Sequence, residues 1–268
     1  MSILVATNFS KLSENAILYA ASVAKKLHTK LILYNAFKLP IHASNARLSA
    51  TFVEGLIEKN RNRLHESAQD LYQKFGIEVI VETSFSSLDQ EVDHLMKVHD
   101  CRFLVIGMSP KSMEQNLLGN PATTLISMKR FPVLAIPIHA KFTEFKKILL
   151  ACDLLEDIPV KTLAKLRQLA VQLKSEVTVF YVEKELNQLR TVTHDSIDKE
   201  LEDVTYFYKN VQSNTVIDAL EEEIKKSQPD LLVMMPKKYG FWESIMHKSK
   251  TRVMASGLNI PLLSIPIK

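Results

Sequence analysis

The chain has 268 residues, 46% apolar and 24% charged, which is typical of a globular protein long enough for two ordinary domains. The net charge of +4 is mild, and no basic run is interleaved with aromatic residues. The sequence therefore lacks the usual signature of nucleic-acid binding. The apolar runs are too short to span a bilayer, and Cys101 and Cys152 make no disulfide framework. Residues 1–20 lack a basic region followed by an apolar core, so we expect no signal peptide. We therefore expect a cytoplasmic protein without a membrane or nucleic-acid partner.

Short apolar runs alternate with longer stretches of helical period along the first half. Ser10 is a candidate N-cap for the first helix, and Gly76 ends the second. A loop over Lys38–Asn45 precedes that second helix. The spacing predicts strands at Ile3–Thr7, Leu31–Tyr34, Ile77–Val81, Phe103–Ile106 and Pro132–Ile138, and helices from Lys11, over about 47–74, over Leu88–Val98 and before Pro132.

The second half repeats this order. Strands are expected at Ile148–Ala151, Val177–Val182, Val204–Val211, Asp230–Met234 and Pro261–Ile267, with helices over about 159–173, 192–202, 215–226 and from Ser249. The opening run Ile3–Asn8 recurs as Ile148–Asp153, and Pro132–Ile138 recurs as Pro261–Ile267 with five of seven residues identical. The pattern indicates a duplicated domain of about 130 residues, and we expect domains at 1–140 and 146–268.

Strands that are apolar on both faces and joined by helices predict an α/β fold with two tandem, doubly wound, five-stranded parallel sheets of the Rossmann-like type. In such sheets ligands bind outside the carboxyl ends of the strands. Three segments of each half should meet there: the turn after the first strand, the end of the second strand, and the loop between the fourth strand and the following helix. In the first half they contain Asn8, Asn35, Gly107, Gly119 and Asn120, and in the second half Asp153, Tyr181, Met235, Lys238, Lys248, Ser249 and Thr251.

On these residues the chain resembles the universal stress protein family in its tandem, two-domain form. The resemblance implies an adenine nucleotide α-hydrolase-like fold and a non-enzymatic stress-response protein. In nucleotide-binding members an Asp follows the first strand. A loop of Gly, two residues, Gly, nine residues, Gly and Ser or Thr cradles the phosphates of ATP. The implied ligand is therefore ATP or another adenine nucleotide, with Mg²⁺ if it is ATP.

Neither repeat matches that motif completely. In the first repeat Asn8 replaces the Asp, Pro110 replaces the second glycine, and the loop is one residue short, although Gly107 and Gly119 are kept. Proline cannot supply the N–H that a phosphate needs there. The second repeat lacks all three glycines but keeps Asp153, Ser249 and Thr251. We expect weak, altered or lost adenine-nucleotide binding, favoured in the second repeat.

A basic segment over 237–252 gives an alternative. Its cations gather at a predicted helix N-terminus, where they either bind another anionic small molecule or form a solvated surface. Asp153 has a structural alternative as well, because a carboxylate in a first helical turn is stabilising without a ligand. The alternative function is a nucleotide-independent scaffold that uses the degenerate sites or this basic loop to bind an unidentified protein.

No catalytic or metal-binding motif is found, and we expect no enzymatic activity. An α-phosphate-cleaving enzyme would need a glycine-containing phosphate loop after the first strand, which neither repeat has. The resemblance further implies that the two final strands, Pro132–Ile138 and Pro261–Ile267, pair across a twofold axis as an internal pseudo-dimer. Homodimerisation of the full chain is left open.

Overall fold

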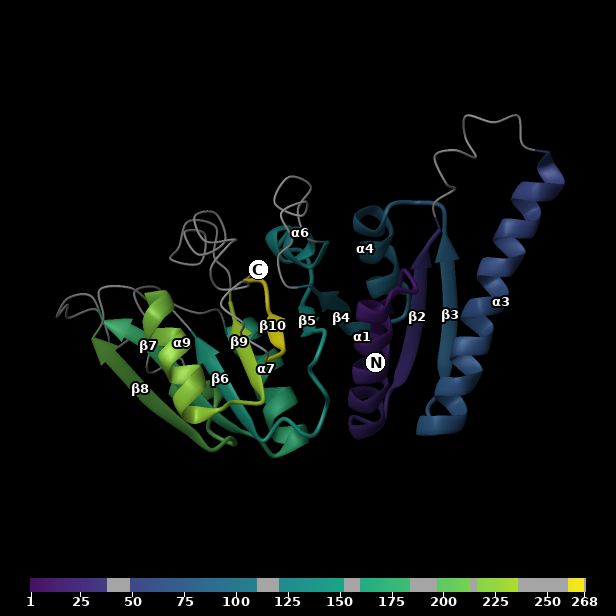
Figure 1. The fold of residues 1–268 in the computed structure, drawn as a ribbon. Coiled ribbons are helices and arrows are strands. Elements are labelled where there is room, and N and C mark those ends of the chain that lie inside the picture. The colour runs from purple at the N-terminus through teal and green to yellow at the C-terminus, as the bar shows by residue number, and fades with distance from the viewer. Residues whose placement is uncertain are drawn as a thin grey trace. The chain divides into compact units, whose positions relative to one another are not determined.

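The computed structural model describes residues 1–37, 49–109, 121–151, 160–183, 197–212, 216–235 and 260–267. Contacts divide the chain into two compact units, Met1–Gly107 and Met108–Lys268 (Figure 1). The last strand of the first repeat belongs spatially to the second unit, because it pairs with the last strand of the second repeat. The division at 140 and 146, which comes from the repeat, stays a prediction about the domains.

The first unit alternates strands and helices. Its described elements are, in chain order, β1 (Ser2–Ala6), α1 (Lys11–Lys26), β2 (Lys30–Ala36), α3 (Ala50–Phe75), β3 (Val79–Ser84), α4 (Leu88–Val98) and β4 (Cys101–Met108).

The strands of this unit lie in the order β3-β2-β1-β4, and every pair among them is parallel. All five residues of β1 are buried, as expected for a strand of a parallel sheet that is apolar on both faces. Ser10 caps α1 as predicted by accepting from the Ser13 N–H, and Gly76 ends α3 in the left-handed region at φ 67°.

The second unit contains the end of the first repeat and all of the second. Its described elements are α6 (Pro121–Ser127), β5 (Val133–Pro137), β6 (Lys147–Ala151), α7 (Val160–Leu173), β7 (Glu176–Glu183), β8 (Tyr206–Gln212), α9 (Val216–Ser227), β9 (Leu231–Met234) and β10 (Leu262–Ser264).

Within this unit the strand order is β5-β10-β9-β6-β7-β8. The order β9-β6-β7-β8 repeats the order β4-β1-β2-β3 of the first unit, and all of these neighbours, like β10 and β9, are parallel. The predicted α/β class is therefore confirmed, and the equal strand order agrees with the repeat in the sequence.

The junction between β5 and β10 is antiparallel. Leu262, Leu263 and Ser264 face Ala135, Leu134 and Val133 in the ladder. Both strands are buried, so each edge that would be bare in one repeat alone is covered by the other. The predicted pairing of the two final strands is confirmed for these residues.

Several predicted boundaries are wrong by a few residues, among them the expected strands Val204–Val211 and Pro261–Ile267, which are Tyr206–Gln212 and Leu262–Ser264. Strand β3 begins at Val79 rather than Ile77, because Gly76 turns the chain and the ladder with β2 starts at Leu31 opposite Val79. The structure describes the predicted helix 192–202 only from residue 197. The helical backbone ends at residue 200, and a turn follows over 201–203. A helix cannot continue there because the chain must enter β8 at Tyr206.

Strands β3 and β8 each contact the helical segment that follows them through the side chain at the fourth strand position. In β3 this is Glu82, whose Oε1 lies 2.8 Å from His99 Nε2. In β8 it is Lys209, whose Nζ lies 2.5 Å from Glu223 Oε2 on α9. The Glu223 side chain is only 4% exposed, so the lysine neutralises a buried carboxylate.

Candidate functional site

The first part of the candidate site is the turn that joins β1 to α1. Asn8 occupies the position of the family's Asp. Its Oδ1 accepts from the backbone N–H of Ser10 at 3.2 Å and from the Ser10 hydroxyl at 2.7 Å. Asn8 therefore forms an Asx turn with its own carbonyl, a role that asparagine shares with aspartate. This carbonyl is already used as an acceptor inside the turn.

The hydroxyls of this turn are also satisfied internally. Thr7 Oγ1 donates to Ser13 Oγ at 3.1 Å and accepts from the Phe9 N–H at 3.0 Å, while Ser13 Oγ donates to the Ser10 carbonyl at 2.9 Å. Phe9 has a φ of 59°, and the Arg63 guanidinium of α3 lies 4.2 Å from the centre of its ring. The turn thus holds the start of α1 in place without needing a bound anion.

Asn35, at the carboxyl end of β2, differs from every other buried polar side chain in the described part of the chain. It is 5% exposed, and its Nδ2 donates to the Thr7 carbonyl at 2.7 Å. That carbonyl can only accept, which fixes the orientation of the amide. Asn35 Oδ1 is then a buried oxygen without a hydrogen-bond partner. The observation identifies an acceptor that lacks a donor at the predicted ligand-binding edge.

Gly107 lies close to the end of β4, where the family's first glycine is expected. A Cβ atom at this position would lie 2.6 Å from Leu12 Cγ and 3.0 Å from the Leu12 carbonyl oxygen. The glycine is therefore required by the approach of α1 to β4. This packing explanation is independent of any phosphate, and the sequence motif does not reveal it.

Aromatic side chains lie beyond the carboxyl ends of β2 and β3. The rings of Phe37 and Phe85 meet edge to face with centres 5.7 Å apart, and Phe85 is 65% exposed. Below them the Tyr34 hydroxyl lies 2.7 Å from Ser84 Oγ, and burial raises the pKa of Tyr34 above its ordinary value. Sequence reasoning missed this group, although two phenylalanines directly after paired strands are the signal for it.

The second repeat is described only in part at the matching positions. Tyr181 lies half-buried in β7, and Met235, which follows β9 at the position of the first glycine, is 2% exposed. A buried methionine thus stands in the second repeat where the first repeat has Gly107. Asp153, Lys238, Lys248, Ser249, Thr251, the basic segment 237–252, and Pro110, Gly119 and Asn120 of the first repeat lie outside the described residues.

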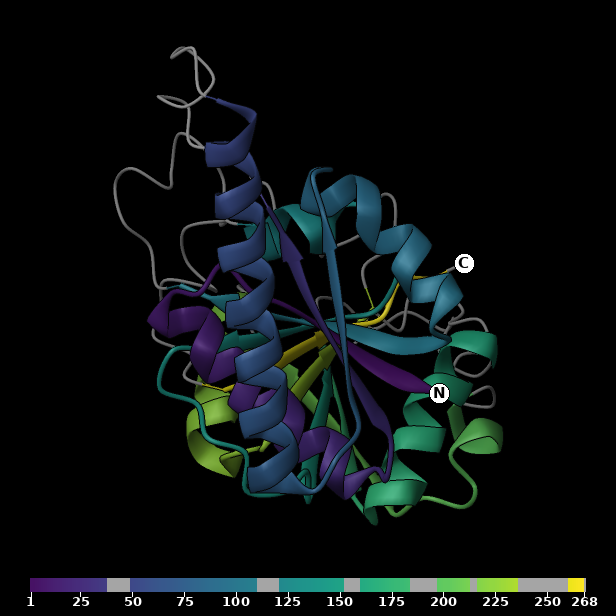
Figure 2. The same cartoon turned by 90° about the vertical axis from the view of Figure 1, so that its right-hand side faces the viewer.

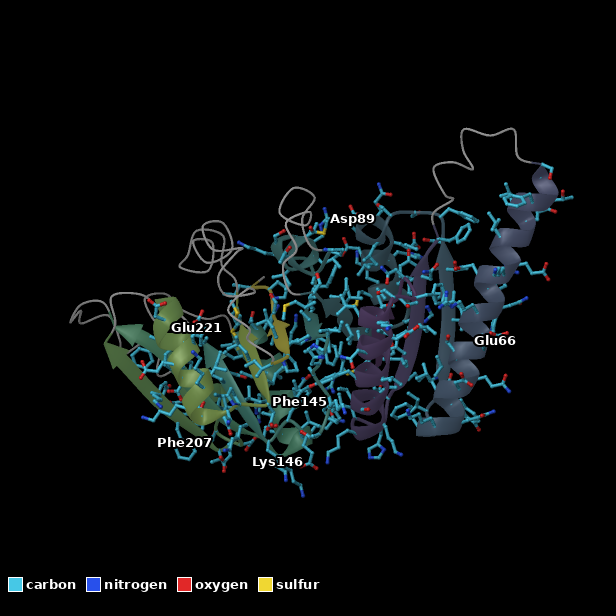
Figure 3. All side chains as sticks on the ribbon, in the orientation of Figure 1. Glu66, Asp89, Phe145, Lys146, Phe207 and Glu221 are labelled. Atoms are coloured by element: carbon cyan, nitrogen blue, oxygen red, sulfur yellow. The ribbon has the colours of Figure 1, made fainter. Side chains whose placement is uncertain are left out.

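The residues described by the structure contain no group of three His, Cys, Asp or Glu side chains arranged to hold a metal ion. In the same ranges, no helix has both the length and the apolar character needed to cross a membrane. Among the described residues of the second unit, Phe207 on strand β8 is the largest exposed apolar side chain, with 56% exposure (Figure 3).

Solved structures with the same fold cover nearly the whole chain. A universal stress protein from Archaeoglobus fulgidus DSM 4304 is 14% identical with a TM-score of 0.72, over 99% of this chain and 96% of that one. A Pseudomonas aeruginosa UCBPP-PA14 structure described as a universal stress protein is 14% identical with a TM-score of 0.57, over 99% and 92%. The cytoplasmic domain of a prokaryotic cation chloride cotransporter is 11% identical with a TM-score of 0.54, over 98% and 94%.

These identities establish the fold alone, and no curated protein matches the sequence. The sequence model of the universal stress protein family matches residues 1–137. That range contains more than half of the 268 residues, including β1 to β5 and the turn, Asn35 and Gly107 of the candidate site. The chain belongs to the universal stress protein family.

Proposed function

We propose that the chain is a non-catalytic stress-response protein whose first repeat binds an adenine nucleotide weakly, through the base rather than the phosphates. The observation that carries this proposal is the buried Asn35 Oδ1, which has no donor. Leaving a buried acceptor unpaired costs about 1–3 kcal/mol. A ligand that donates a hydrogen bond there would recover part of that free energy on binding.

The chemistry of this atom selects the ligand. A carbonyl oxygen only accepts, and phosphate oxygens at neutral pH accept as well, so Asn35 Oδ1 does not favour a phosphate. The exocyclic amino group of adenine is a donor of suitable character. Phe37 stands two residues beyond Asn35 and pairs with Phe85, which offers an apolar aromatic surface near a planar base. Both features favour the base end of a nucleotide.

The phosphate end is poorly supported in the first repeat. The Asn8 carbonyl is used within the Asx turn, and Ser10 already accepts from the Ser13 N–H at the start of α1. In the second repeat the proposal rests on Asp153, Ser249 and Thr251, which keep the side chains of nucleotide-binding members. Those residues would hold the phosphates, with Mg²⁺ if the ligand is ATP.

A thermal-unfolding titration of the full chain tests the proposal with adenosine, AMP, ADP, ATP with and without Mg²⁺, and inorganic phosphate. A ligand that binds the native state alone stabilises it by about 2.7 kcal/mol at a hundredfold excess over its Kd. We expect a saturable shift with adenosine, which Asn35→Leu abolishes. Asp153→Ala then reports on the second repeat, through loss of the additional shift that ATP produces over adenosine.

Thr7→Val is the matched control for Asn35→Leu. Thr7 is also buried beside the turn, but the hydrogen bonds of its hydroxyl are made within the protein. The variant should lower the melting temperature and keep the adenosine-induced shift. If neither adenosine nor any adenine nucleotide shifts the wild type at millimolar concentration, the proposal is wrong.

A second candidate function is a nucleotide-independent scaffold. The self-satisfied turn from Thr7 to Ser13 favours it, because the start of α1 is stable without a ligand. If the chain is such a scaffold, none of the nucleotides changes the thermal midpoint, and the chain binds a protein partner instead.

A further inference from the structure

Arg63 connects helix α3 to the turn that joins β1 to α1. Figure 2 shows α1 and α3 on the same side of the first unit's sheet, with α4 on the other side. The Arg63 guanidinium lies 4.2 Å from the centre of the Phe9 ring. Glu14 Oε1 of α1 lies 4.0 Å from Arg63 Nη2, and both of these side chains are more than half exposed. An exposed ion pair at that distance contributes little, so the contact with the ring is the stronger of the two.

Phe9 has a backbone conformation that its side chain disfavours. Its φ of 59° lies in the left-handed region, which a bulky residue adopts only under constraint. The other described non-glycine residues with positive φ follow the ends of helices, where this conformation is usual, whereas Phe9 comes before one. Such a conformation persists only where the surrounding structure holds it. The guanidinium over the ring is one of the contacts that hold Phe9.

The same turn determines the orientation of Asn35. The Thr7 carbonyl is the first carbonyl of the turn, and it accepts from Asn35 Nδ2 at 2.7 Å. This bond leaves Asn35 Oδ1 as the buried acceptor without a donor. Phe9 stands two residues beyond Thr7, so its φ sets the direction in which the backbone leaves that carbonyl. A turn that relaxes at Phe9 therefore moves the group that orients the Asn35 amide.

We infer that Arg63 is a positioning residue of the candidate site, which holds Phe9 in its left-handed conformation and thereby keeps Asn35 Oδ1 in place for the donor of a ligand. The inference rests on the proposed function, because the positioning serves the binding of adenine at Asn35. Arg63 acts through the turn and not by contact with the base. The site of the first repeat then includes α3, an element that contributes nothing to the sequence motif.

Calorimetric titration with adenosine and with purine riboside, which lacks the exocyclic amino group, tests the inference in variants of Arg63. We expect the preference for adenosine to fall toward equality in Arg63→Met, which keeps a long side chain without the charge. Arg63→Lys should keep more of the preference, because an ammonium can also lie over the ring. A merely destabilised protein would bind both nucleosides less well and would keep the preference. Arg61→Met is the matched control, since Arg61 is exposed on the same helix, and it should keep the preference of the wild type.

A double-mutant cycle with Phe9→Gly tests the contact without any ligand. Glycine adopts the left-handed conformation without strain and has no ring. Arg63→Met should therefore lower the urea midpoint of the wild type and leave the midpoint of Phe9→Gly unchanged.

The two experiments separate failure of the inference from failure of the proposed function. A wild type without a preference for adenosine contradicts the proposed function, and the cycle still tests the inference. The inference is overturned if Arg63→Met lowers the urea midpoint equally with Phe9 and with glycine at that position. It is equally overturned if the wild type prefers adenosine and Arg63→Met keeps that preference, or if Arg63→Lys loses as much of it as Arg63→Met.

Discussion

Replacing Gly107 by alanine tests why the family's first glycine is retained in the first repeat. The new methyl group would lie 2.6 Å from Leu12 Cγ, 3.1 Å from Leu12 Cδ1 and 3.0 Å from the Leu12 carbonyl oxygen. The side chain can rotate, but the carbonyl belongs to the first turn of α1 and moves only with the helix. Overpacking of this kind costs about 1–3 kcal/mol.

Urea unfolding measures this cost, as a lower midpoint with an unchanged slope. Gly55→Ala is the matched control, because nothing lies within 4 Å of a Cβ atom there. We expect this control to raise the free energy of unfolding by about 0.5–1 kcal/mol, the ordinary advantage of alanine over glycine in a helix. The two identical changes should therefore shift the midpoint in opposite directions.

The result that would refute this reasoning is a Gly107→Ala variant as stable as the wild type. In that case the packing against Leu12 would not explain the glycine. Its retention would then be better explained by the approach of a ligand to the strand end, and the variant should weaken nucleotide binding without lowering the free energy of unfolding.

Further predictions concern an ion pair, a thiol and a helix cap. Lys209→Met leaves the buried Glu223 carboxylate unpaired and should lower the free energy of unfolding by about 3 kcal/mol. Adding Glu223→Leu should recover most of this loss. A double variant that is no more stable than Lys209→Met alone contradicts the prediction. Burial raises the pKa of the Cys101 thiol. In a Cys152→Ser variant, alkylation of Cys101 should therefore keep accelerating above pH about 8.5 rather than level off there. Ser10→Ala should cost about 1 kcal/mol in urea unfolding and Ser10→Gly only a few tenths, an order that a cap predicts and a solvated serine does not.

Much of the fold could be predicted because burial on both faces of a strand leaves a clear sequence signal. Runs such as Ile3–Thr7 and Val177–Val182 are mostly apolar, and their alternation with helical segments indicates a parallel α/β arrangement. The pairing of β5 with β10 could be predicted from the repeated final strand together with the family resemblance. Boundaries were less predictable, since Ile77 is as apolar as a strand residue but precedes the ladder.

The chemistry of the site was less accessible to sequence reasoning. A motif comparison treats Gly107 as a phosphate-loop residue, but only coordinates reveal the carbonyl of Leu12 3.0 Å from its missing Cβ. Asn8 and Asn35 are the same residue type at two strand ends, yet one carbonyl is used in a turn and the other has no donor. Such differences depend on distances between elements that are far apart in the sequence.

The central claim is that Asn35 Oδ1 accepts a hydrogen bond from an adenine base. Calorimetric titration with adenosine and with purine riboside, which lacks only the amino group, tests it most directly. We predict that the wild type binds adenosine about tenfold more tightly, which corresponds to about 1.4 kcal/mol, and that Asn35→Leu removes the difference. Equal affinities of the wild type for the two nucleosides, or a preference that survives in Asn35→Leu, would contradict the claim.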